Sequence, residues 1–68
     1  MTNDNRNKLK TLLVYWIEHN EEHSQEFKEW AGRAKEFGAP ETAEALLQAT
    51  LEMDKASVLL SRALATLE

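Results

Sequence analysis

Hydrophobic side chains recur at alternating intervals of four and three residues along the first half of the chain. The expected stripe consists of Leu9, Leu13, Trp16, Asn20, His23, Phe27, Trp30, Ala34 and Phe37. This spacing places side chains on one face of an α-helix, and no proline interrupts the segment. Gly32, the one glycine within it, is tolerated in a helix interior at a cost of about 1 kcal/mol relative to alanine. The pattern predicts one helix over residues 8–37, preceded by a frayed polar lead over residues 1–7.

A glycine and a proline divide the chain near its middle. Gly38 suits the left-handed conformation that often ends a helix, and Pro40 suits the first turn of the next one. We therefore expect a turn over residues 38–40 and a second helix over residues 41–67. Its stripe is expected to consist of Leu46, Thr50, Met53, Ser57, Leu60, Leu64 and Leu67.

A turn this short predicts an all-α fold in which residues 1–68 form one antiparallel helical hairpin. Facing residues should have numbers that add up to about 78 if the turn is centred near Ala39. An alternative begins a new helix near Asn20, whose side chain can cap a helix, and this would give a three-helix bundle. The unbroken stripe favours the continuous helix.

The hairpin is expected to need further burial of apolar surface. A chain of 68 residues without cysteine has a small core and no disulfide or thiolate metal site to stabilise it. Apolar side chains also extend beyond a two-helix contact, which predicts a dimer that forms a four-helix bundle, or docking on a larger protein. The predicted interface residues are Leu12, Trp16, Ile17, Leu47, Leu51 and Val58.

The charge pattern excludes some classes of partner. The net charge of −4 and the scattered lysines and arginines argue against a nucleic-acid-binding surface, which needs a continuous basic stripe. No apolar run reaches the ~18 residues of a membrane span, and the polar start does not match a signal peptide. We therefore expect neither nucleic acid nor membrane as a partner, and a cytoplasmic location.

The two histidines lie one helical turn apart in a segment rich in glutamate. His19 and His23 are at positions i and i+4, so a continuous helix places both imidazoles on one face, within reach of one cation. Glu22 and Glu26 lie on a neighbouring row. Imidazole and carboxylate ligands together suit Zn²⁺, Ni²⁺ or Co²⁺ better than Mg²⁺ or Ca²⁺. These four residues are the predicted metal ligands.

The same residues also allow a structural interpretation. Glu18, Glu22 and Glu26 repeat at intervals of four, which is typical of a solvated helix face, although a bound cation would relieve their mutual repulsion. Asn20 and His23 can form a polar layer that fixes the register of the helices, as a buried asparagine does in coiled coils. The sequence leaves both interpretations open.

Residues 19–23 also match the H-x-x-E-H pattern of inverted zinc peptidases, in which two histidines hold zinc and the glutamate activates water. This chain is a fraction of the size of such an enzyme, and it lacks the substrate-binding strands that the motif requires. A third ligand would have to come from Glu52 or Asp54 in the second helix. The chain also has no glycine-rich phosphate loop. We therefore expect no enzymatic activity.

Residues 12–23, followed by Phe27, Trp30 and the turn at Gly38, resemble a small uncharacterised helical-hairpin domain family of anaerobic microbes, sometimes found near metal-cofactor machinery. The resemblance implies a hairpin over nearly the whole chain and brings no established activity. We therefore predict a non-enzymatic helical interaction and assembly module. The alternative is a small protein that binds or delivers a divalent transition metal.

Overall fold

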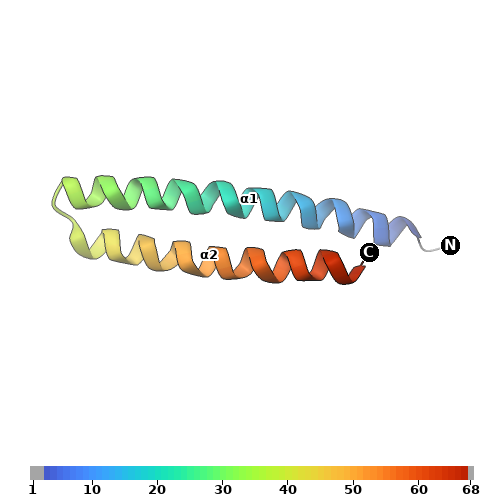
Figure 1. The fold of residues 1–68 in the computed structure, drawn as a ribbon. Coiled ribbons are helices and arrows are strands. Elements are labelled where there is room, and N and C mark those ends of the chain that lie inside the picture. Colours follow the sequence, from blue (N-terminus) through green and yellow to red (C-terminus); the bar gives the residue numbers. More distant parts are fainter. Residues whose placement is uncertain (1–2, 68) are drawn as a thin grey trace.

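The computed structural model describes residues 3–67, which form two long helices joined by a short turn. Helix α1 spans Asn3–Glu36 and helix α2 spans Pro40–Leu67. The helices run antiparallel and side by side, so the start of α1 and the end of α2 lie together at the end of the molecule opposite the turn (Figure 1). The expected all-α hairpin is confirmed. The alternative three-helix bundle is wrong, because α1 continues without a break through Asn20.

The first helix begins earlier than the sequence suggested. Residues 3–7 belong to α1 rather than to a frayed lead, while Met1 and Thr2 lie outside the described residues. Asp4 lies in the first turn, where its negative charge complements the helix dipole. The Arg6 guanidinium donates a hydrogen bond of 2.6 Å to the carbonyl of Leu67, which ties this turn to the last turn of α2.

The turn is closed by two backbone hydrogen bonds that begin at Gly38 and Ala39. The Ala39 amide donates to the Ala34 carbonyl at 2.7 Å and the Gly38 amide donates to the Lys35 carbonyl at 3.3 Å. Gly38 has a φ of 88°, the left-handed conformation expected after a helix end. The carbonyl of Ala39 accepts a bond from Ala43 at 3.0 Å, so α2 begins at Pro40, one residue before the expected start.

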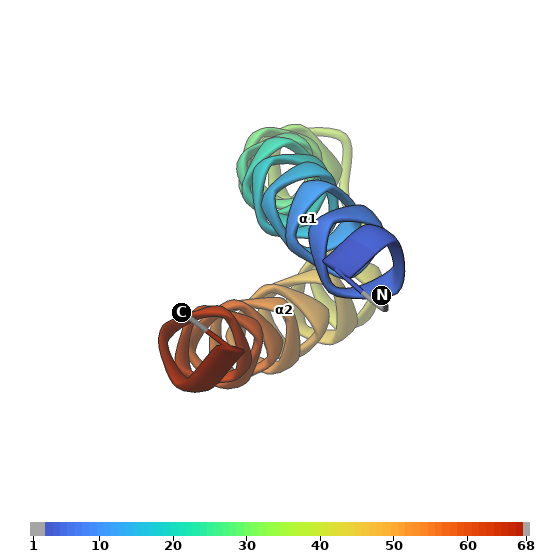
Figure 2. The same ribbon diagram turned by 90° about the vertical axis from the view of Figure 1, so that its right-hand side faces the viewer.

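The least exposed residues of each helix repeat at intervals of three and four, as in a coiled coil. On α1 this seam contains Lys10, Leu13, Ile17, Asn20, Ser24, Phe27, Ala31 and Ala34. On α2 it contains Ala43, Leu46, Thr50, Met53, Ser57, Leu60, Leu64 and Leu67. The Ser24 hydroxyl donates a hydrogen bond of 2.8 Å to Asp54 Oδ1 across the seam, which agrees with the expected register. Viewed along their length, the two helices cross at an angle (Figure 2).

Half of the expected stripe on α1 lies one residue away from the observed seam. Trp16 is 38% exposed and Trp30 is 51% exposed, and the positions facing α2 are taken by their neighbours Ile17 and Ala31. Small residues at the seam allow the helices to approach closely, whereas indole rings between two helices would hold them apart. His23 lies beside the seam with its side chain 39% exposed, so the expected polar layer does not include it.

The core of the hairpin is small. Within residues 3–67 the buried apolar side chains are Leu13, Ala31, Ala34 and Ala43. The chain exposes 5245 Å², whereas a globular monomer of its mass of 7.8 kDa exposes roughly 4,400 Å². The excess is roughly 850 Å² per chain. No helix among the described residues combines the length and apolar character of a membrane span.

Candidate functional site

The imidazoles of His19 and His23 meet through their Nε2 atoms, which are 3.0 Å apart. The ring centroids are 4.3 Å apart and the ring planes are nearly perpendicular, at 89°. One continuous turn of α1 creates this contact, because side chains at i and i+4 lie above one another on a helix. The two imidazoles therefore share a hydrogen bond in which one Nε2 donates and the other accepts, and their binding of one cation stays a prediction.

Two further aromatic side chains extend this pair along α1. The Tyr15 ring stacks on His19 with centroids 5.5 Å apart and an interplanar angle of 14°. Phe27 lies on the other side, with its centroid 5.9 Å from that of His23. Each histidine thus has an aromatic neighbour one turn away. Such packing limits the directions that the imidazoles can adopt.

Neither of the predicted carboxylate ligands, Glu22 and Glu26, contacts the Nε2 atom of a histidine. Glu26 Oε1 lies 3.5 Å from Nδ1 of His23, the ring nitrogen that does not face His19. Glu22 is exposed and makes no hydrogen bond or ion pair with either histidine. Throughout the described part of the chain, no three or more His, Asp or Glu side chains are placed to hold one metal ion. One chain therefore offers two imidazole nitrogens and one carboxylate that can orient a ring.

The histidines belong to a second stripe on α1, separate from the seam. It repeats at intervals of three and four, and its residues are Leu9, Leu12, Trp16, His19, His23, Glu26, Trp30 and Arg33. The exposed members include four large hydrophobic residues, and the Arg33 guanidinium lies 4.6 Å from the centroid of the Trp30 ring. We call this row the histidine stripe. The sequence contained the signal, because this row includes the expected stripe positions within α1 that the seam leaves out. The expected helix end was wrong by one residue: α1 ends at Glu36, and Phe37 lies exposed in the turn.

Helix α2 carries a matching row that we call the alanine stripe. Its residues are Ala45, Ala49, Glu52, Ala56, Leu59, Ala63 and Thr66. Ala49, Ala56 and Ala63 each precede a seam residue of α2, just as Trp16, His23 and Trp30 precede seam residues of α1.

A surface pocket shows which side of the hairpin these rows occupy. Lys28, Lys35, Pro40 and Leu47 line this pocket together. Lys28, Lys35 and Leu47 each directly follow a seam residue. Residues that follow the seam therefore share one side, and residues that precede it share the other. We call the side with both stripes the histidine face.

The predicted interface residues fall into three groups. Leu12 and Trp16 are exposed on the histidine face, whereas Ile17 is half-buried in the seam between the helices. Three exposed residues of α2 form a strip on the opposite side: Leu47, Leu51 and Val58. Sequence reasoning placed Trp30 in the seam between the helices, yet half of its side chain is exposed on the histidine face.

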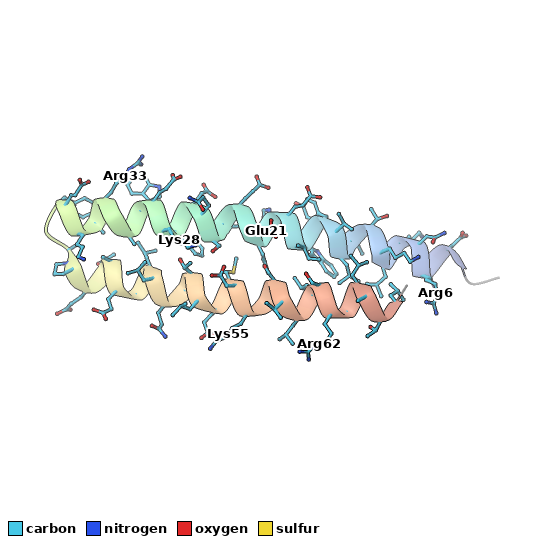
Figure 3. The ribbon with its side chains drawn as sticks, viewed as in Figure 1. Arg6, Glu21, Lys28, Arg33, Lys55 and Arg62 are labelled. Carbon is cyan, nitrogen blue, oxygen red and sulfur yellow. The ribbon has the colours of Figure 1, made fainter. Side chains whose placement is uncertain are left out.

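Charged side chains mark the outer edges of the hairpin. Lys55 and Arg62 extend from α2 away from α1, and Arg33 extends from α1 away from α2 (Figure 3). Lys55 forms an exposed ion pair of 3.5 Å with Glu52, and pairs of this kind contribute little to stability.

One family model matches this chain, a domain of unknown function (DUF8180) that covers residues 9–67. Comparison with curated proteins finds no match, and neither does comparison with solved structures. The match confirms the expected relation to an uncharacterised domain family, while an origin in anaerobic microbes stays a prediction. The chain belongs to the family of the domain of unknown function DUF8180.

Proposed function

We propose that this chain is a non-enzymatic assembly module that forms a symmetric homodimer through its histidine face. The observation that carries the proposal is the row of α1 in which exposed leucines and tryptophans flank the two histidines, with Glu26 and Arg33 as its charged members, beside a row of α2 in which most residues are alanine. Exposed apolar patches of this extent mark interaction sites. A four-helix bundle would result, with the histidine faces of two hairpins in contact.

The size of the histidine face suits a stable dimer. The hairpin measures 57 Å by 14 Å by 11 Å, so one long face has an area of roughly 800 Å², which is what each partner buries in a standard protein interface. The same area matches the roughly 850 Å² by which the chain exceeds the surface of a globular monomer. A second copy on this face would cover an area of about that size.

A twofold axis requires a centre at one level of both helices. The histidine stripe is centred between His19 and His23. Because Ser24 lies opposite Asp54, this centre lies at about the level of Ala56 in the alanine stripe. In a symmetric interface, residue i meets residue j and j meets i. One twofold axis, perpendicular to the helices, thus brings α1 against α1 and α2 against α2.

Small and large side chains are distributed in a way that favours this arrangement. Leu12 of one copy would lie against Trp30 of the other, and Ala49 against Ala63. The opposite side is less suitable, because Lys28 and Lys35 of α1 lie next to Leu47 there and the cores of interfaces are depleted of charge. A dimer through Leu47, Leu51 and Val58 would also leave both tryptophans exposed.

Sedimentation equilibrium of the full chain tests the proposal. With excess chelator present, we expect a mass of about twice the 7.8 kDa of one chain at micromolar concentration. A monomer mass over the whole concentration range would contradict the homodimer and would favour docking on a different, larger protein. The cytoplasmic location stays a prediction.

A second candidate function is the binding or delivery of a divalent transition metal. The 3.0 Å separation of the two Nε2 atoms favours it, since Zn²⁺, Ni²⁺ and Co²⁺ accept imidazole ligands. A metal that binds only the folded state raises the melting temperature. Thermal melting with each of these ions should show that rise, with Mg²⁺ as the control. Equal melting temperatures with and without transition metal would refute this function.

A further inference from the structure

We infer that the dimer holds one divalent transition metal ion on its twofold axis, bound by His19 and His23 from both copies. The inference rests on the proposed homodimer and adds a ligand to it. The chemical class of the ligand is an ion that prefers four nitrogen donors, with Zn²⁺ as the best match.

The histidine pair is already spaced for one metal ion. Zinc binds imidazole nitrogen at 2.0–2.1 Å, so two nitrogens on one zinc ion lie about 3.0 to 3.4 Å apart for bond angles between a right angle and the tetrahedral value. The Nε2 atoms of His19 and His23 are 3.0 Å apart. In the hydrogen bond between these atoms one Nε2 donates and the other accepts. A metal ion would replace the shared proton, so the donating ring would carry its proton on Nδ1 and both rings would turn their Nε2 lone pairs toward the ion.

The carboxylate of Glu26 lies beside the ring nitrogen of His23 that would not bind the metal. Its Oε1 lies 3.5 Å from Nδ1 of His23, so a small shift would let it accept a hydrogen bond from a proton on Nδ1. In that tautomer Nε2 has the lone pair that binds a metal. Metal-binding histidines usually have such a carboxylate partner on the second ring nitrogen. Both rings are also accessible to an ion, because His19 is exposed and the His23 side chain is 39% exposed.

One chain alone cannot complete the coordination. Within residues 3–67 no third His, Asp or Glu joins the pair, whereas structural zinc sites have four protein ligands. The proposed twofold axis passes between His19 and His23, so it brings the pair of one copy against the pair of the other. Four imidazoles then converge at one point. The chain contains no other histidine, so each copy contributes all of its imidazoles.

The test is a zinc titration of the full-length chain, first freed of metal with a chelator. Binding is followed by competition with a chromophoric chelator, and sedimentation equilibrium is run on the same samples. We expect one Zn²⁺ per two chains, and NMR signals of both imidazoles that shift together until that ratio is reached. Co²⁺ should bind in the same ratio and show the intense visible absorption of a four-coordinate site.

The outcomes separate this inference from the proposed dimer. A dimer that binds no zinc, or that binds one zinc per chain, overturns the shared site and leaves the proposed function intact. A chain that stays monomeric with and without zinc overturns both. A further outcome is a dimer that binds one zinc per two chains with an affinity for zinc that the histidine substitutions below do not change. That result would overturn the assignment of His19 and His23 as the ligands.

Substitutions identify the ligands. The double variant His19→Gln, His23→Gln keeps residues with good helix propensity and should remain helical by circular dichroism, while its zinc affinity falls by more than about 100-fold. Glu26→Gln should weaken zinc binding by roughly 10-fold or more, as loss of a carboxylate behind a metal-binding histidine does. Glu29→Gln removes the same charge one turn further along α1 and is the matched control, with zinc affinity expected to change by less than about threefold.

Discussion

Replacing Trp30 with alanine removes the largest exposed side chain of the histidine face. Trp30 is 51% exposed in the single hairpin, and a tryptophan side chain has roughly 250 Å² of surface, so about 125 Å² per copy is open to a partner. At ~25 cal/mol per Å² its burial stabilises a dimer by about 3 kcal/mol per copy, or about 6 kcal/mol for both.

Burial in the dimer will be incomplete, and alanine retains part of the contact. We therefore expect Trp30→Ala to raise the dimer dissociation constant by about 10² to 10⁴-fold. Sedimentation equilibrium over a series of concentrations measures this constant, and circular dichroism on the same samples reports helix content. Trp30 lies outside the seam between α1 and α2, but about half of it is buried within the hairpin and Arg33 lies over its ring. Helix content therefore separates a weaker dimer from a weaker hairpin.

Val58→Ala is the matched control on the opposite side of the hairpin. Val58 is 62% exposed, so it also offers apolar surface to a partner, but it lies outside the histidine face. The dimer dissociation constant of this variant should stay within about threefold of that of the unsubstituted chain. The reverse result, a dimer weakened by Val58→Ala and unaffected by Trp30→Ala, would refute the assignment and place the interface on the strip of α2.

Three stability predictions concern the hairpin itself, each measured by thermal or denaturant unfolding at fixed chain concentration. Gly38→Ala should lower the free energy of unfolding by about 1 kcal/mol, because the φ of 88° disfavours a side chain; an unchanged value would contradict the observed cap. Gly32→Ala should raise the free energy of unfolding by about 0.8 to 1 kcal/mol, because alanine is the better helix former and an added Cβ meets nothing within 4 Å. A loss of stability would show that Gly32 is in close contact with another surface. Ser24→Ala should lower it by about 1 kcal/mol through loss of the bond to Asp54, whereas Thr11→Ala, which removes an exposed bond within α1, should have a smaller effect.

The turn and the second helix could be predicted from the sequence because local chemistry determines them. Gly38 supplies the left-handed cap and Pro40 begins α2, as the preferences of these residues require. The expected stripe of α2, from Leu46 to Leu67, coincides with its observed seam. The early start of α1 could not be predicted, because a contact with a distant residue, Leu67, holds its first turns.

The seam of α1 was harder to predict because this helix carries two apolar stripes. Leu13, Asn20, Phe27 and Ala34 belong to the observed seam and also to the expected stripe. The pattern alone does not decide whether the row of Trp16 or the row of Ile17 completes it. Hydrophobicity favours the tryptophan, but close approach of two helices favours smaller side chains. The row with the bulky tryptophans was therefore assigned to the contact between the helices, although the structure leaves that row exposed.

The histidine pair was found from spacing alone, but its surroundings were not. Positions i and i+4 on a helix guarantee proximity, and the 3.0 Å contact agrees with that. The choice between Glu22 and Glu26 depends on side-chain directions that spacing does not specify, and Glu26 is the one in contact with His23. The ligands that we propose from a second copy depend on the symmetry of a dimer, which the spacing of residues within one chain does not specify.

Cysteine cross-linking at Ala56 tests the central claim most directly. The claim is a twofold axis that passes between His19 and His23 on α1 and through the level of Ala56 on α2. The chain has no cysteine, so Ala56→Cys introduces a single thiol. The proposed axis places this thiol next to the same thiol of the second copy. A disulfide requires Cα atoms within roughly 7 Å of each other. Under mild oxidation Ala56→Cys should form a covalent dimer rapidly, while Ser61→Cys, on the opposite side of α2, should not. Equal cross-linking of the two variants, or none by Ala56→Cys, would contradict the proposed dimer.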